Sequence, residues 1–146
     1  MLICGKVNPP PPEDPNYNGV YFSQKDNMSE TARGLKNLPI WVEHDSRTVV
    51  GKVLQGWVDP REGSMWALAE LNVKDISGAM AASAVEHNRL QDFSLGYSIE
   101  VNQSKDGRMN VDKKTVHEVS LVKSGARENC HIFCKEKVYK KNDHSR

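Results

Sequence analysis

No stretch of this 146-residue sequence is apolar for the roughly 18 consecutive residues that a membrane-spanning helix needs. The N-terminal segment MLICGKVNPPPP also lacks the basic and apolar regions of a cleavable secretion signal. An excess of one charge is missing too, because 20 Lys and Arg face 19 Asp and Glu, for a formal net charge of +1. Such a balance gives no global field that would attract nucleic acid or an anionic membrane. We therefore expect a soluble, non-secreted protein whose partners include no nucleic acid and no membrane.

Cysteine is scarce, with three residues at Cys4, Cys130 and Cys134. The number is odd and a domain of this length does not need disulfides, so we expect reduced thiols in a cytosolic or nuclear compartment. The Cys-x3-Cys spacing of the last two is permitted in a tetrahedral zinc site, but the chain has no second such pair to complete it. A small metal-binding domain is the less favoured alternative. We expect no metal and no cofactor, and buried strand positions for the cysteines.

Apolar residues make up 38% of the chain and 10 glycines add to them, which is the usual share for a globular protein. The length corresponds to one ordinary domain and leaves little room for a second core. We expect one domain over residues 1–139, followed by a polar tail over residues 140–146.

Short β-rich stretches bounded by turn residues dominate the sequence. The expected strands are Leu2–Val7, Gly19–Ser23, Ile40–Glu43, Thr48–Val58, Met65–Val73, Phe93–Val101, Thr115–Val122 and Asn129–Tyr139. The three between residues 40 and 73 follow one another as a β-meander, with a turn cluster at residues 59–63. A proline run at residues 9–12 predicts an extended surface connection, and residues 104–107 predict a hairpin turn.

Two segments have helical character. Ser29 is expected as the N-cap of a helix that ends near Leu35, and Asp75 as the N-cap of a second helix that runs to Leu90. The apolar residues at helical spacing in the second helix are Ile76, Met80, Ala84 and Val85. Many short strands with one or two inserted helices predict a mainly β fold with some α, a barrel or folded sheet that carries helices on its outside.

Three segments contain side chains that acyl-transfer chemistry uses. They are LPIWVEHD at residues 38–45, FSLGYS at residues 93–98 and HEVSLVKSGAR at residues 117–127. Each of these features is common in residues that have no chemical role: a histidine after a strand, a serine beside a glycine, and a glutamate in a strand. The order and context of the three segments carry more information than any one of them.

In that order and context, the segments resemble the capsid-maturation serine proteases of herpesviruses, the assemblins, and the prohead proteases of tailed bacteriophages. The "LPI-x-V-x-HD" pattern, followed by Val49–Val53, resembles the stretch around the first catalytic histidine and places it at His44. The FSLGYS segment, which follows an Ala-rich helix, resembles the nucleophile segment "FS-x-GY" of phage enzymes. This places the nucleophile at Ser94.

The third segment departs from the herpesvirus branch. Herpesvirus enzymes have a histidine seven positions before a glycine that two arginines follow, whereas this chain has Glu118 seven positions before Gly125. Phage enzymes with "EVSLV" have an acid there too. His117 lies one residue away, and strand side chains alternate, so the two cannot line one site without a bulge. We favour Glu118 as the third catalytic residue and keep His117 as the alternative.

The resemblance implies an assemblin-like barrel surrounded by a few helices, and a serine endopeptidase that uses Ser94, His44 and Glu118. One arginine after the glycine helps to stabilise the oxyanion in assemblins, and only the second is present here, as Arg127. The implied substrate is the internal scaffolding protein of a procapsid, together with the chain's own junctions. The implied partners are this scaffold, the major capsid protein and a second copy of the chain. The implied location is the procapsid interior, in host cytoplasm or nucleus. The alternative is a non-catalytic barrel that binds scaffold or capsid protein.

Overall fold

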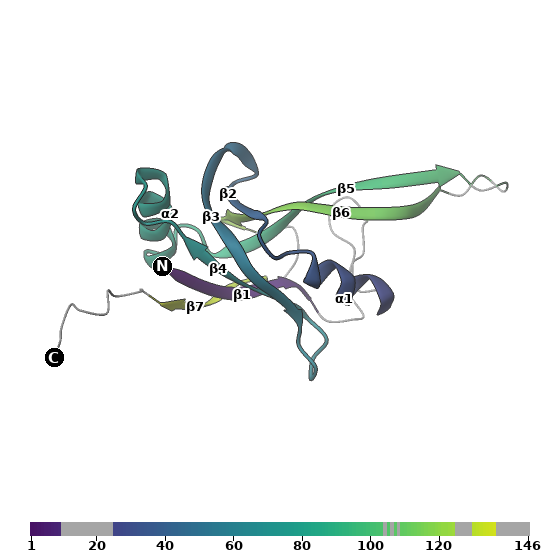
Figure 1. Cartoon of the computed structure of the whole chain (residues 1–146), viewed down its shortest axis with the longest axis horizontal. Coiled ribbons are helices and arrows are strands. Elements are labelled where there is room, and N and C mark those ends of the chain that lie inside the picture. Colours follow the sequence, from purple (N-terminus) through teal and green to yellow (C-terminus); the bar gives the residue numbers. More distant parts are fainter. Residues whose placement is uncertain (10–24, 104, 106, 108, 125–129, 137–146) are drawn as a thin grey trace.

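The structure is a computed structural model, and it describes residues 1–9, 25–103, 105, 107, 109–124 and 130–136 (Figure 1). The elements in chain order are β1 Leu2–Asn8, α1 Lys25–Arg33, β2 Pro39–Val42, β3 Asp45–Val58, β4 Met65–Leu71, α2 Ile76–Glu86, β5 Asp92–Gln103, β6 Met109–Val122 and β7 Ile132–Glu136. Neither helix in the described part of the chain has the length and apolarity to cross a bilayer.

All seven strands belong to one sheet, in the order β5-β6-β2-β3-β4-β1-β7. Every neighbouring pair is antiparallel except β2 and β6, which run parallel with Trp41 opposite Ser120. The expected meander is confirmed, since β2, β3 and β4 pair in succession. The parallel pairing matters for the site, because the turn that follows β2 emerges beside the last residues of β6.

The sheet curls until its two edge strands meet at one end. The backbone N–H of Phe93 donates to the carbonyl of Cys130 at 2.8 Å, and the N–H of Ile132 donates to the carbonyl of Gln91 at 2.9 Å. Between them, Asp92 and His131 form an isolated bridge whose side chains contact at 2.6 Å. A curled sheet with two helices packed against β3 and β4 confirms the predicted fold class, mainly β with some α.

The core follows from the alternation of side chains along the strands. In β4, the sequence MWALAEL buries Met65, Ala67, Ala69 and Leu71, which lie on one face of the sheet.

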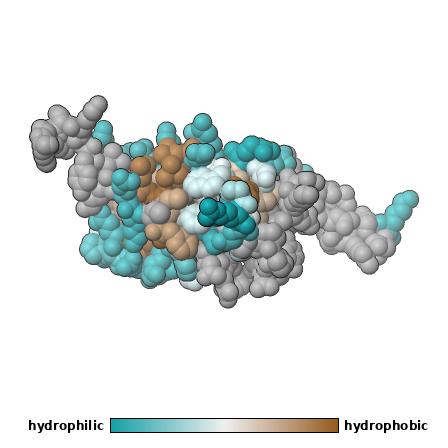
Figure 2. Space-filling model, turned by 90° about the horizontal axis from the view of Figure 1, so that it is seen from below, coloured by the Kyte–Doolittle hydropathy of each residue, from teal (hydrophilic) through white to brown (hydrophobic). Residues whose placement is uncertain are grey.

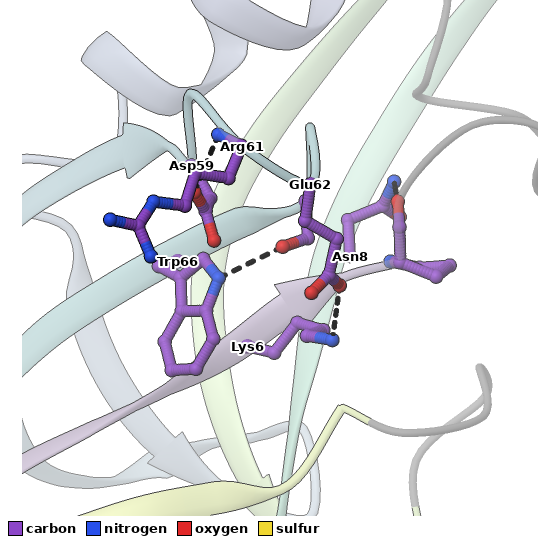
Figure 3. A network of polar contacts seen from close by, with 8 residues as sticks. Lys6, Asn8, Asp59, Arg61, Glu62 and Trp66 are labelled. Atoms are coloured by element: carbon purple, nitrogen blue, oxygen red, sulfur yellow. Dashed lines mark hydrogen bonds and ion pairs between the residues drawn. The ribbon is translucent and has the colours of Figure 1, made fainter.

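The far end of the β3–β4 hairpin is fixed to β1, because the ammonium of Lys6 donates to Glu62 at 2.6 Å (Figure 3). Trp66 packs beside that ammonium and donates to the hydroxyl of Ser64 at 2.9 Å.

Helix α1 begins before the position expected from the sequence. Ser29 lies inside the helix and is not its N-cap. Met28 is buried together with Ala32 and Leu35, at spacings of four and three residues, so the buried face of this segment already includes the residue before Ser29.

Helix α2 is present, but it ends at Glu86, and the expected apolar face is only partly buried: Val85 is buried and Ala84 packs against the core, as expected. Ile76 and Met80 are 81% and 67% exposed, whereas the small residues Gly78, Ala81 and Ala82 face the sheet. A side chain at Gly78 would collide with the backbone of Asn72, so small residues let the helix approach closely. Asn88, with φ at +58°, turns the chain away after the helix.

Strand β7 is shorter within the described residues than the expected Asn129–Tyr139. The expected strand Gly19–Ser23, most of the proline run, the tail at residues 140–146 and part of the turn at residues 104–107 lie outside the described residues.

Candidate active site

Ser94 lies near the start of β5, directly opposite Ser120 of β6. The preceding Phe93 is 1% exposed and belongs to the core, which fixes the start of the strand. Ser94 itself is 7% exposed, so its hydroxyl lies at the inner edge of the site. Because the residues just before Ser94 bond to residues 130–132, Ser94 lies close to the place where the sheet closes on itself.

His44 lies in the two-residue turn between Val42 and Asp45, which are paired across β2 and β3. Both turn residues have positive φ, +49° for Glu43 and +59° for His44. Asn and Gly are the residues that favour such a turn, and other residues cost of order 1 kcal/mol or more in this conformation. Strain of this kind persists only where surrounding contacts hold it.

Strand β6 supplies contacts that hold the turn. The N–H of Glu43 donates to the carbonyl of Leu121 at 3.0 Å, and its carboxylate accepts the N–H of Lys123 at 2.9 Å. The strained turn is therefore fixed to the strand that carries Glu118.

The three predicted residues meet in one chain of contacts. His44 Nε2 lies 3.0 Å from Ser94 Oγ, and His44 Nδ1 lies 2.6 Å from Glu118 Oε1. An ionised carboxylate only accepts hydrogen bonds, so Nδ1 carries the proton and Nε2 is left to accept from the serine hydroxyl. In this arrangement the imidazole can take the hydroxyl proton while the carboxylate stabilises its charge.

The site is buried on one side and open on the other. Glu118 is 2% exposed, whereas the side chain of His44 is 44% exposed. A substrate can therefore reach the hydroxyl of Ser94 from the side of the imidazole, while the carboxylate stays away from water.

Gly96 provides the space for this carboxylate. It lies opposite Glu118 in the β5–β6 register, and a Cβ built on it would lie 2.5 Å from the carboxylate carbon of Glu118. Gly96 belongs to the FSLGYS segment, whose resemblance to the nucleophile segment indicated no role for it. The role of Gly96 depends on Glu118, which is 22 residues away in the sequence, so a local sequence pattern cannot predict it.

His117 does not join the site. The register passes from Gly96 opposite Glu118 to Tyr97 opposite Val116, so His117 is the extra residue of a β-bulge. Its Nε2 contacts the hydroxyl of Ser98 at 2.7 Å on the exposed side of the sheet. Of the two residues left open by the sequence, the structure brings Glu118 to His44.

Asp45 follows the histidine directly but contacts Arg47 instead. Its carboxylate accepts the backbone N–H of Arg47 at 3.0 Å and two guanidinium N–H groups at 3.1 and 3.2 Å. These hydrogen bonds from Arg47 lower the pKa of Asp45 below its ordinary value. The acidic residue of the "HD" pattern therefore closes the turn and does not orient the imidazole.

Ser120 is a polar residue of the site, and its place in the third segment gave no indication of this role. It is fully buried and contacts both Glu118 and the backbone of His44. Arg127 lies outside the described residues. No group of three or more His, Cys, Asp and Glu side chains in the described part of the chain is placed to hold a metal ion.

The fold is similar to that of a herpesvirus protease. A structure of the protease of Kaposi's sarcoma-associated herpesvirus with a hexapeptide phosphonate inhibitor matches with a TM-score of 0.64 at 16% identity, over 90% of this chain and 63% of that chain. A complex of that protease with an allosteric inhibitor matches with a TM-score of 0.57 at 16% identity, over 92% and 78%. A complex with a dimer disruptor gives 0.54 at 16% identity, over 90% and 73%. The chain thus spans less than two thirds of the length of the first of these proteins.

The family follows from the sequence profile. The profile of the caudovirus prohead serine proteases matches residues 23–144, which is most of the chain, and the chain belongs to this family. No curated protein sequence matches it significantly. The family expected from the three short segments is therefore confirmed.

Proposed function

We propose that the chain is a serine endopeptidase in which Ser94 is the nucleophile, His44 the general base and Glu118 the residue that orients and stabilises the imidazolium. The observation that carries this proposal is the continuous contact from Ser94 Oγ through the imidazole of His44 to the carboxylate of Glu118, at 3.0 and 2.6 Å. A serine hydroxyl is a weak nucleophile at neutral pH until a neighbouring base removes its proton, and this geometry supplies that base.

In the acylation step, Ser94 Oγ attacks the carbonyl carbon of the scissile peptide bond while its proton passes to His44 Nε2. The carbonyl oxygen becomes an oxyanion, and the tetrahedral intermediate collapses when Nε2 returns the proton to the leaving amine. The acyl group is then esterified to Ser94. Water attacks this ester by the same route, with His44 as base, and frees the second product.

Oxyanion stabilisation needs fixed donors, each worth about 10²–10³ in rate. We assign part of this role to Arg127, on the resemblance of the segment that contains it to the assemblin sequence. This assignment stays a prediction from the sequence.

The proposed substrate is an extended segment of the internal scaffolding protein of the procapsid, and also the chain's own junctions. Family membership supports this choice, because prohead proteases are named for that particle. The proposed location is the procapsid interior, in host cytoplasm or nucleus, where the major capsid protein would be a neighbour.

A homodimer is the proposed assembly. One matching herpesvirus structure is a protease bound to a dimer disruptor, so that protein has a dimer to disrupt. In this chain, the outward face of α2 presents Ile76 and Met80 to solvent. Figure 2, a view from below, shows an apolar area in the half of the molecule where Figure 1 places β1 and β7.

The test combines a fluorophosphonate probe with cleavage of a procapsid scaffolding protein. We expect the wild type to be labelled at Ser94 and to cut the scaffold, and Ser94→Ala to do neither while it remains folded. The matched control is Ser98→Ala, four residues along the same strand and bonded to His117, which should keep both activities. A wild type that cuts without labelling, together with an equally active Ser94→Ala variant, would reject the serine assignment. Scaffold binding without any cleavage would favour the non-catalytic barrel.

A further inference from the structure

The hydroxyl of Ser120 joins two parts of the candidate active site. Its Oγ donates to Glu118 Oε2 at 2.6 Å and accepts the backbone N–H of His44 at 3.1 Å. Ser120 is 0% exposed, so water does not compete for either contact. The two residues of β6 are two positions apart, which places both side chains on the same face of the strand.

These contacts close a ring of three groups. Glu118 uses one carboxylate oxygen for the imidazole of His44 and the other for Ser120, while Ser120 holds the backbone of the same histidine. A hydroxyl has one proton, and its donation to the carboxylate leaves its lone pairs for the N–H group. The carboxylate and the histidine are therefore positioned relative to one another through one oxygen atom.

The backbone of His44 needs such a contact. Its φ of +59° lies in the left-handed region that a residue with a Cβ rarely adopts. The contacts from Leu121 and Lys123 reach the preceding residue, Glu43, whereas Ser120 reaches His44 itself. Without the hydroxyl, the turn can relax and carry the imidazole away from Ser94.

We propose that Ser120 is a positioning residue that fixes the carboxylate of Glu118 and the strained backbone of His44 together, so that the imidazole meets Ser94 in a reactive geometry. This inference rests on the proposed serine protease function. Ser120 touches no substrate, because it lies buried behind the carboxylate.

The experiment compares wild type, Ser120→Ala and Ser120→Cys in steady-state hydrolysis of a scaffold-derived peptide and in the rate of fluorophosphonate labelling at Ser94. A displacement of about 1 Å in a catalytic group can cost about 10² in rate, so we expect Ser120→Ala to lower kcat by roughly 10- to 100-fold. KM should stay within about twofold, because the peptide does not contact Ser120. The labelling rate should fall in parallel with kcat. Ser120→Cys keeps a weak donor of similar size and should lie between the two.

The outcomes separate this inference from the proposed function. If the wild type neither hydrolyses the peptide nor labels at Ser94, both proposals fail. If Ser94 labels normally and a folded Ser120→Ala keeps the wild-type kcat, the role of Ser120 alone is rejected. If Ser120→Ala does not fold, Ser120→Cys decides, and a kcat equal to wild type in that variant overturns the inference. Ser98→Ala, which removes a serine–histidine contact outside the site, should leave kcat and labelling unchanged.

Discussion

Gly96 of β5 lies directly opposite Glu118 of β6, and the carboxylate of Glu118 fills the space that a side chain at position 96 would need. The closest atoms to a Cβ built at Gly96 all belong to that carboxylate and its stem. A glycine in a strand usually weakens it, because it adds backbone entropy and no packing. Here the missing side chain lets a buried acid turn toward His44.

Gly96→Ala should therefore damage activity more than stability. The added methyl group would push the carboxylate of Glu118 off the imidazole of His44, and we expect kcat to fall by about 10² or more. The flexible end of Glu118 can move without displacing backbone, so the free energy of unfolding should fall by only about 1–2 kcal/mol. Peptide hydrolysis and urea unfolding measure the two effects. Gly34→Ala is the matched control, since its Cβ would meet no atom closer than 3.5 Å. A Gly96→Ala variant with wild-type kcat would show that the carboxylate has no catalytic role.

Glu118→Gln should be the most harmful change that keeps the shape of the site. The amide cannot stabilise the imidazolium that forms during acylation, and loss of a carboxylate in this role costs up to about 10⁴ in kcat in serine proteases. The measurement is kcat with a scaffold peptide, beside circular dichroism to confirm the fold.

His117→Ala provides the comparison for that change. His117 lies on the exposed side of the bulge and contacts Ser98, so kcat should change by less than about twofold. The reverse pattern, with His117→Ala inactive and Glu118→Gln active, would mean that the herpesvirus arrangement with a second histidine applies in solution through a shifted register.

The fold class followed from local patterns because strand alternation and turn residues are local signals. The buried face of α2 followed only in part. Val85 is buried as expected, whereas Ile76 and Met80 face solvent because close packing against Asn72 requires Gly78 and its small neighbours inside. Close approach of two backbones is decided by tertiary contact, which a hydrophobicity pattern does not contain.

The residues of the candidate site also divide into those that the sequence predicted and those that only the structure revealed. The sequence motifs named His44, Ser94 and Glu118, and the structure brings these three together. The sequence could not predict a role for Ser120 or Gly96, because each residue acts on a residue of another segment. The β2–β6 and β5–β6 pairings bring these segments together. All residues from 118 to 122 are buried, so both faces of this part of β6 are covered, and burial alone does not separate site residues from core residues.

The pair of Asp92 and His131 should stabilise the end where the sheet closes on itself. The carboxylate contacts the imidazole Nδ1 at 2.6 Å, and the histidine side chain is 50% exposed, so solvent screens the interaction. We expect a coupling of about 1 kcal/mol in a double-mutant cycle of Asp92→Ala and His131→Ala, measured by urea unfolding. The cycle separates this pair from the other contacts of Asp92. A coupling indistinguishable from zero would assign the closure to the backbone hydrogen bonds alone.

The outer face of α2 should control self-association. Ile76 and Met80 are one helical turn apart and strongly exposed, so they form a short apolar strip that a partner can cover. Burial of a large apolar side chain contributes about 1.5–3 kcal/mol, and a symmetric contact uses each residue twice. The Ile76→Lys, Met80→Lys double variant should therefore weaken dimerisation by roughly 100-fold or more, while the stability of the monomer changes by less than about 0.5 kcal/mol. Sedimentation velocity and specific activity, followed together across a dilution series, provide the measurement. If the wild type dissociates on dilution while its specific activity stays constant, dimerisation does not control catalysis. If the double variant dimerises as tightly as the wild type, the dimer contact lies elsewhere on the surface.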